Sequence, residues 1–314
     1  KGINDNSSRQ LRESLVRSVS AANPETPTLP VGSPADGGSG GTPTGVAGGP
    51  RPFPVLEPVS PLLTLLATIT GNLYLLFGTT FFSIVSILVA PIPPRGNWTN
   101  RAARMWAQGL LWSSWIRLEV RHAVATGAPV AAAAAADDRF VIMANHQSLF
   151  DIPALLAAIP GQSRFIAKRS LFKIPIFGWA MAAGGFIPVD RKDRSTAKDS
   201  FGSALDRLSR GASIVLFPEE LRSLGGKVLP FRRGGFLMAL KSGLPVVPVG
   251  IHGTLAVQSR RSFLIRPQTV TVHFGAAIAL AGRSVRELPA LTAAVRAQVA
   301  ALAGTECADE DVSQ

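Results

Sequence analysis

The chain has 314 residues, of which 32 are Lys or Arg and 20 are Asp or Glu, giving a formal net charge of +12 at pH 7. Its single cysteine, Cys307, excludes a disulfide framework and a cysteine-based zinc site. Only 17% of the residues are charged while 46% are hydrophobic, which excludes a highly charged disordered chain and favours contact with a membrane. The positive excess indicates a polyanionic partner, which is nucleic acid, anionic lipid or a phosphorylated substrate.

Residues 1–57 form the first predicted segment, a tail without net charge. Its stretch 21–61 is rich in Pro, Gly, Ser and Thr and holds too little apolar surface to offset the entropy of ordering. We therefore expect a disordered tail over 1–57. The whole excess of charge falls on residues 95–314, which carry 27 basic and 15 acidic residues.

The next segment, 58–94, contains no charged residue. Its apolar core 62–90 is longer than the roughly 20 residues that one upright membrane-spanning helix needs. Two membrane arrangements fit: a tilted single span, or a helical hairpin broken near Gly71–Asn72 or Gly78 that enters one leaflet. A buried helix pair of a soluble protein is the third alternative. We predict that 58–94 is a membrane-embedded two-helix segment.

An aromatic-rich helix is predicted over 100–114. Its tryptophans lie near Arg101 and Arg104, a composition that suits a membrane interface but also an ordinary helix packed on a core. Together with Arg95, these arginines follow the apolar segment closely. The positive-inside rule then places the rest of the chain in the cytoplasm, at the inner face of the plasma membrane.

The body, 95–304, alternates short apolar strands with helical stretches, which indicates an α/β fold with a mixed central sheet flanked by helices. The last residues, 305–314, are predicted to form an acidic tail. Strands are predicted at 117–122, 140–144, 164–167, 186–189, 213–217, 246–251 and 269–274. Helices are predicted at 152–159, 171–183, 195–209, 235–242 and 285–302.

His146 and Asp151 are the clearest candidates for chemistry. They follow the apolar strand 140–144, and functional groups in α/β folds gather at the carboxyl ends of strands. Residues five apart do not share a face of a helix, so His146 must lie in the turn and Asp151 in the first helical turn. Such an Asp would orient the imidazole as a base. Because no serine or cysteine stands in a nucleophile-elbow sequence, the base would activate a substrate hydroxyl or water.

Two further segments place arginines after short strands. Arg191 ends the stretch 185–191, and Arg222 follows Phe217 in the sequence FPEELRS. If both reach the sheet edge that holds His146, two guanidinium groups would suit a phosphate. Taken singly, an arginine in such a position is more often a solvated surface residue.

These segments, in this order, resemble the four motifs of the glycerolipid acyltransferase family, in particular its 1-acylglycerol-3-phosphate (lysophosphatidate) acyltransferases. Residues 145–151 match the pattern NHxxxxD, residues 185–191 loosely match the second motif, and 247–251 match VPVxI. The third motif, FPEGTRS, reads FPEELRS here, with Glu220 and Leu221 in place of Gly and Thr. The resemblance covers about residues 60–280.

The resemblance implies acyl transfer from acyl-CoA or acyl-carrier protein to the sn-2 hydroxyl of 1-acyl-sn-glycerol-3-phosphate, without a metal or cofactor. His146 would be the base and Asp151 would orient it. The acceptor would be bound by Lys168, Arg191, Glu219 and Arg222. Family members also dock one leaflet through an N-terminal two-helix element, which favours the hairpin at an anionic membrane surface.

The altered third motif leaves alternatives open. Glu220 adds a negative charge beside Arg222, and the loss of Gly there would be costly if the backbone needs a positive φ. Another lysolipid, such as a lyso-ornithine lipid or a lysophospholipid, is an alternative acceptor, and an inactive lipid-binding protein is an alternative function. Nucleic-acid binding is disfavoured because the basic residues are dispersed, without a basic run.

Overall fold

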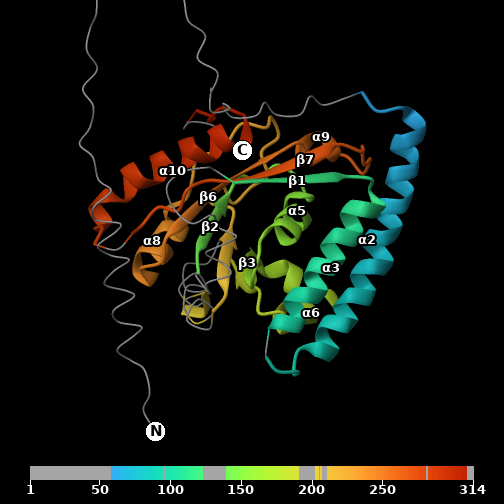
Figure 1. The fold of residues 1–314 in the computed structure, drawn as a ribbon, viewed down its shortest axis with the longest axis horizontal. Helices are drawn as coiled ribbons and strands as arrows, with labels where there is room; N and C mark the ends of the chain where they lie inside the picture. The colour runs from blue at the N-terminus through green and yellow to red at the C-terminus, as the bar shows by residue number, and fades with distance from the viewer. Residues whose placement is uncertain are drawn as a thin grey trace, which may run out of the picture. The chain divides into compact units, whose positions relative to one another are not determined.

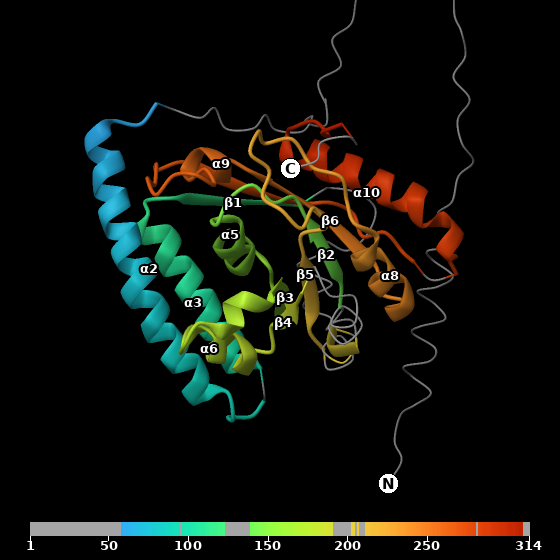
Figure 2. The same cartoon turned by 180° about the vertical axis from the view of Figure 1, so that it is seen from behind.

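The computed structural model shows a mixed seven-stranded sheet with helices on both faces, which confirms the predicted α/β fold (Figures 1 and 2). The predicted tail 1–57 and most of the predicted helix 195–209 lie outside the described residues. The structure describes residues 58–94, 96–122, 139–190, 202–204, 206, 211–280 and 282–309.

The strands are ordered β1-β7-β6-β2-β5-β3-β4 in the sheet. Neighbours pair in parallel except β6 and β7, so β1 and β7 run against the other five strands. All seven predicted strands are confirmed, since strands buried on both faces stand out as apolar runs between turn residues. Their bounds are β1 (Arg117–His122), β2 (Val141–Ala144), β3 (Ser163–Lys168), β4 (Ile187–Val189), β5 (Ser213–Leu216), β6 (Val246–His252) and β7 (Thr269–Phe274).

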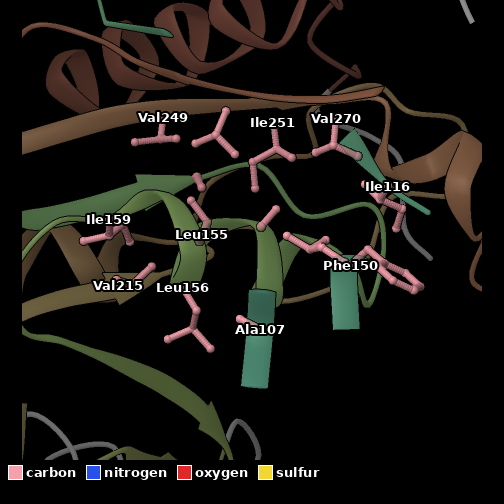
Figure 3. Close-up of a cluster of buried hydrophobic side chains, with 14 of the residues drawn as sticks. Ala107, Ile116, Phe150, Leu155, Leu156, Ile159, Val215, Val249, Ile251 and Val270 are labelled. Atoms are coloured by element: carbon pink, nitrogen blue, oxygen red, sulfur yellow. The ribbon is translucent and has the colours of Figure 1, made fainter. Parts of the chain in front are cut away.

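Two hydrophobic cores cover the two faces of the sheet. One includes Leu155, Leu156 and Phe150 from the region of α5, packed on Val249 and Ile251 of β6 (Figure 3). The other lies under α8 and α10 on the opposite face. The remaining helical elements are α5 (Asp151–Ala158), α8 (Arg233–Ser242), α9 (Thr254–Val257), η2 (Val285–Glu287) and α10 (Leu288–Ala303).

The apolar segment forms one uninterrupted helix, α2 (Pro61–Val89). The predicted break near Gly71–Asn72 or Gly78 is therefore wrong, and 58–94 does not contain two helices. Gly71 permits close contact instead, because a Cβ there would lie 2.6 Å from Ser114 Oγ and 2.7 Å from Ile265 Cδ1.

A helical hairpin does exist, but its second arm is α3 (Asn97–Ser113). The two helices lie side by side, and α3 packs on α5 over one face of the sheet (Figures 1 and 2). Thr70 Oγ1 donates to Ser113 O (2.5 Å), and Trp106 Nε1 donates to Thr79 Oγ1 (3.0 Å). Several polar groups of α2 thus bind the body, while most of its large apolar side chains are exposed.

The outer face of α2 is strongly apolar and open. Large side chains along its whole length are exposed, among them Leu65, Ile69, Phe77, Phe81 and Leu88. Within the described part of the chain, α2 is the single helix long and apolar enough to cross a membrane. Buried core helices do not expose such a face, so the alternative of a buried helix pair does not hold.

Two other sequence expectations change in detail. The predicted helix 171–183 is divided into a 3₁₀ helix, η1 (Arg169–Lys173), and α6 (Phe177–Ala183), because Pro175 disfavours helical backbone in the preceding residue. In α3, Arg104 donates hydrogen bonds to Ile159 O and Gly161 O, so this arginine ties α3 to the end of α5.

The C-terminal end of the described chain is held on the body. Val228 N donates to Glu306 O and Ala308 N donates to Val228 O, both at 2.9 Å. The chain is therefore bound through Ala308, three residues beyond the predicted start of the acidic tail.

Gly250 allows α10 to approach β6 closely. A Cβ on Gly250 would lie 2.1 Å from the carbonyl carbon of Leu302 and 2.3 Å from the backbone nitrogen of Ala303. We predict that Gly250→Ala lowers the free energy of unfolding by about 2–3 kcal/mol, because the α10 backbone must move. Gly234→Ala is the control, since a Cβ there meets nothing within 4 Å. Denaturant unfolding in detergent would measure both, and equal stabilities would contradict this packing argument.

Candidate active site

The segment after β2 is held against β6 by two polar side chains. Asn145 Nδ2 donates to Ile251 O (3.0 Å), and Ile251 N donates to Asn145 Oδ1 (2.7 Å). Gln147 Nε2 also donates to Ile251 O (2.7 Å). These bonds extend the β2–β6 pairing beyond the end of β2, and they fix the backbone on both sides of His146.

His146 and Asp151 meet as their spacing predicts. His146 lies in the turn, and Asp151 is the first residue of α5. His146 Nδ1 lies 2.7 Å from Asp151 Oδ2, the same oxygen that accepts hydrogen bonds from the backbone nitrogens of Gln147 (2.7 Å) and Ser148 (2.8 Å). With the Asp as acceptor, Nδ1 carries the proton and Nε2 keeps a free lone pair.

The other oxygen of Asp151 accepts from Thr254 Oγ1 at 2.5 Å. Thr254 begins α9, directly after β6, and both side chains are fully buried. Ser148 Oγ donates to Gln258 O (2.7 Å) and makes a second link to the same region. Sequence reasoning missed Thr254, because only its position after a strand could have suggested it.

The ring of His146 also packs against an aromatic side chain on one of its faces. Phe217, directly after β5, stacks on it with ring centroids 4.1 Å apart and planes 16° apart. The His146 side chain is 15% exposed and lines a large cavity. Asp151 and Phe217 together leave the imidazole a single orientation in which it borders this cavity.

Glu219 is a buried residue that binds the backbone of the site. It is 4% exposed, and its two oxygens accept hydrogen bonds from His146 N (2.6 Å) and Leu229 N (2.8 Å). Ser223 N returns a hydrogen bond to His146 O (2.8 Å). Burial raises the pKa of Glu219 to about 8, against the opposing effect of the two N–H groups. The carboxyl group of Glu219 thus holds the loop after β5 to the backbone of His146.

The cavity has a volume of about 950 Å³. This is the upper part of the range for pockets that enclose drug-sized ligands. Its walls are mainly apolar, with one side supplied by α2 (Leu75, Leu76, Thr79), α3 (Trp106) and α6 (Met181). The site of His146 therefore opens into a space shaped for a long apolar group.

Basic side chains border the same cavity. Lys168, at the end of β3, is exposed, while Arg222 is half-buried. Burial, followed by the nearby Arg260, lowers the pKa of the Arg222 guanidinium, and Asp151 opposes this shift. Sequence reasoning missed Arg260 and Arg232, which also line the cavity. Arg191 lies outside the described residues, so its predicted place at this edge stays a prediction.

Glu220 departs from the usual backbone conformation. Its φ is +61°, a value that glycine adopts without strain and other residues adopt at a cost. The expectation that this loop needs a positive φ is confirmed. Glu220 also lines the cavity together with Arg222.

Among the described residues, no group of three or more His, Cys, Asp and Glu side chains is placed to hold a metal ion. The chemistry of the site instead combines one imidazole base, a buried carboxylate and several cations beside an apolar cavity. Such a set is suited to removing a proton from a hydroxyl while an anionic group is held nearby.

Comparison with known proteins agrees with this geometry. Residues 125–252 match the family model named Acyltransferase. This match covers less than half of the chain. The matched span includes β2, α5, β5 and the whole of β6, and with them His146, Asp151 and Glu219.

The proteins that this chain resembles carry consistent names. A chloroplastic 1-acyl-sn-glycerol-3-phosphate acyltransferase of Brassica napus is 42% identical over 119 residues, which cover 38% of this chain and 34% of the relative. The chain thus spans about a third of the length of this relative. A 1-acyl-sn-glycerol-3-phosphate acyltransferase of Pseudomonas aeruginosa is 28% identical over 239 residues, 75% of this chain and 90% of the relative.

A solved structure shares the fold. The crystal structure of the 1-acyl-sn-glycerophosphate (LPA) acyltransferase PlsC from Thermotoga maritima superposes with a TM-score of 0.63 at 25% identity. The match covers 76% of this chain and 93% of that chain. Because the structural match extends well beyond residues 125–252, the similarity is one of architecture as well as of local sequence.

The raised pKa of Glu219 predicts a pH-dependent contribution to stability. The folded state holds this proton more tightly than the unfolded chain, so the contribution is complete below the ordinary pKa of 4.5 and is lost as the pH rises toward 8. We predict that the difference in unfolding free energy between the wild type and Glu219→Gln falls across this range, by at most about 1.4 kcal/mol per pH unit.

Glu287→Gln is the control for this experiment. Hydrogen bonds from the backbone and side chain of Ser284 lower the pKa of Glu287, so its contribution is lost as the pH falls instead. Denaturant unfolding in detergent at a series of pH values measures both variants. A wild-type minus Glu219→Gln difference that stays constant with pH would contradict the role of burial at Glu219.

Proposed function

We propose that this protein transfers a fatty acyl group from an acyl thioester to the sn-2 hydroxyl of 1-acyl-sn-glycerol-3-phosphate. The observation that carries this proposal is the His146–Asp151 pair, with His146 lining a large apolar cavity that arginine and lysine also border. A base, an apolar chain site and an anion site are what this acceptor requires. The names of the relatives agree with that acceptor.

His146 is the proposed general base. Its Nε2 takes the proton of the acceptor hydroxyl while the oxygen attacks the thioester carbonyl. The tetrahedral intermediate then collapses, the carbon–sulfur bond breaks, and the proton on His146 passes to the departing thiolate. Asp151 keeps the imidazole in the correct tautomer and stabilises its positive charge between these two steps.

The phosphate of the acceptor is the proposed ligand of Arg222, Lys168 and Arg191. A planar guanidinium can bind two phosphate oxygens at once, and its partial burial at Arg222 strengthens that contact. Glu219 was predicted to contact the acceptor, but both of its oxygens accept backbone N–H groups. Its proposed contribution is therefore to position the backbone of His146.

The proposed donor is acyl-CoA or acyl-carrier protein, and the transfer needs no metal or cofactor. We also propose that the apolar outer face of α2 enters the membrane from the cytoplasmic side, at an anionic surface. The exposed leucine and phenylalanine side chains along α2 support this placement, as do the arginines that follow the helix. This placement brings the cavity wall formed by α2 next to the lipids that the reaction consumes.

We predict that His146→Ala lowers kcat by about 10²–10⁴-fold, because the acceptor hydroxyl loses its base. The matched control is His252→Ala, which removes a histidine from the end of the neighbouring strand β6; His252 binds Ala303 O and does not line the cavity. A radiolabelled acyl thioester and lysophosphatidate measure the transfer. Undiminished transfer in His146→Ala would exclude the base role, and an inactive wild type would favour a lipid-binding protein.

Glu220 tests the choice of acceptor. We predict that Glu220→Gln lowers KM for lysophosphatidate several-fold, because a negative charge leaves the cavity that holds Arg222. Glu220→Gly removes the same charge and also the backbone strain, so it should match the effect on KM and raise the stability by about 1 kcal/mol.

A panel of acceptors completes this test. Lyso-ornithine lipid and a zwitterionic lysophospholipid are offered beside lysophosphatidate to the wild type and to both Glu220 variants. If the wild type acylates one of these and not lysophosphatidate, the proposed acceptor is wrong while acyl transfer stands. Of these two alternative acceptors, the lyso-ornithine lipid fits the site better, because its amine can form an ion pair with Glu220.

A further inference from the structure

The loop between α9 and β7 contains a large apolar side chain that is unusually exposed. Phe263 is 86% exposed, more than any other large apolar residue in the described parts of the chain, and Leu264 beside it is 45% exposed. Single exposed apolar residues are common on soluble proteins, but an exposed Phe–Leu pair at the tip of a loop is not.

The tip is held firmly in this exposed position. Ile265, directly after it, is buried, and its backbone nitrogen donates to Thr68 Oγ1 (2.9 Å). Arg266 N donates to Val257 O (2.9 Å), which closes the base of the loop. Leu264 N donates to Ser262 Oγ (3.0 Å) within the tip. The folded chain thus presents Phe263 to the outside through a set of specific bonds.

These bonds place the tip beside the apolar face of α2. Asn72 Nδ2 of α2 reaches Phe263 O at 3.4 Å, and Ile69 and Leu73, about half exposed, lie within one helical turn of Asn72. In Figures 1 and 2 the orange segment that follows α9 lies next to α2. Trp112, at the end of α3 that Thr70 binds, is 82% exposed. The tip therefore continues the apolar face of α2.

Positive charge surrounds the tip. Arg260, Arg261 and Arg266 are all exposed, and no Asp or Glu occurs anywhere in residues 221–286, which contain ten Lys or Arg. Aromatic and aliphatic side chains flanked by arginine are the composition of segments that rest in the headgroup layer of an anionic membrane. Binding to a protein partner or to a second copy of the chain would not require a surface whose charged residues are all positive.

The same loop reaches the cavity at its other end. Arg260 lines the cavity, and its positive charge contributes to the lowered pKa of the Arg222 guanidinium. Gln258, two residues earlier, also lines the cavity and accepts the hydrogen bond from Ser148 Oγ. Only two residues, Arg261 and Ser262, therefore separate Phe263 at the tip from a cation that lines the candidate active site.

We propose that residues 259–266 form a second lipid-docking element beside α2. Phe263 and Leu264 enter the acyl region of an anionic bilayer, and Arg261 and Arg266 bind lipid phosphates at its surface. Arg260 then offers the first cation on the path from the headgroup layer into the cavity. This last step rests on the proposed function, whereas the docking of the tip does not.

Site-specific labelling tests the docking of the tip. The full-length chain with Cys307→Ser and Phe263→Cys is labelled with an environment-sensitive dye and reconstituted into vesicles of equal parts phosphatidylcholine and phosphatidylglycerol. We predict a blue shift and quenching by lipids that carry a nitroxide on the acyl chain. Phe77→Cys, on the exposed face of α2, reports insertion of that helix, and Arg283→Cys, beside α10, is the water-exposed control.

The arginines are tested by partition between two vesicle populations, one of pure phosphatidylcholine and one that contains phosphatidylglycerol. Arg261→Gln with Arg266→Gln should shift the distribution away from the anionic vesicles about 30-fold, since each basic residue near such a surface contributes about 1 kcal/mol. The control pair, Arg283→Gln with Arg286→Gln, should leave the distribution within about 2-fold.

Two outcomes would overturn the proposal. One is a dye at position 263 that stays in water while the dye at position 77 is quenched by lipid. The other is a dye at position 263 that becomes buried without vesicles as the protein concentration rises, which would make the tip a contact between copies of the chain. Both measurements read lipid contact and not acyl transfer, so an inactive enzyme would leave them interpretable.

Discussion

The buried carboxylate of Asp151 is the interaction on which the site and much of the sheet edge depend. It is fully buried and accepts four hydrogen bonds, from His146 Nδ1, the backbone nitrogens of Gln147 and Ser148, and Thr254 Oγ1. A buried carboxylate without such donors would cost several kcal/mol. The loop after β2, the start of α5 and the start of α9 must therefore stay together, which gives the imidazole a fixed place.

Around that carboxylate, other buried polar side chains also join separate segments through hydrogen bonds. Asn145 and Glu219 use side-chain atoms to bind backbone groups of β6 and of two loops, where the regular pairing of the strands has ended. Because β2 lies between β5 and β6, the loops that follow all three strands meet at His146. The strand order explains why residues far apart in the chain share one site, and the polar side chains explain why that site is rigid.

Sequence patterns predicted what depends on local order. Seven strands were recognisable as apolar runs, and the spacing of His146 and Asp151 after a strand predicted their contact, which the structure confirms. Contacts between segments far apart in the chain could not be predicted from such local patterns. Gly71 is ambiguous by itself, since glycine can break a helix or permit close packing, and only the position of Ile265 decides between them. Thr254, Arg260 and the stacking of Phe217 were missed for the same reason.

A histidine base does not by itself distinguish a lipid hydroxyl from water, and attack by water would hydrolyse the thioester. In the proposed reaction, the walls of the cavity make that distinction, because a space lined by Leu75, Leu76 and Trp106 disfavours water and accepts an acyl chain. Two of these three side chains belong to α2. The helix proposed to hold the protein at the membrane is therefore also a wall of the active site. Detaching α2 would expose His146 to water, so membrane attachment and transfer in preference to hydrolysis depend on the same contacts between α2, α3 and the body.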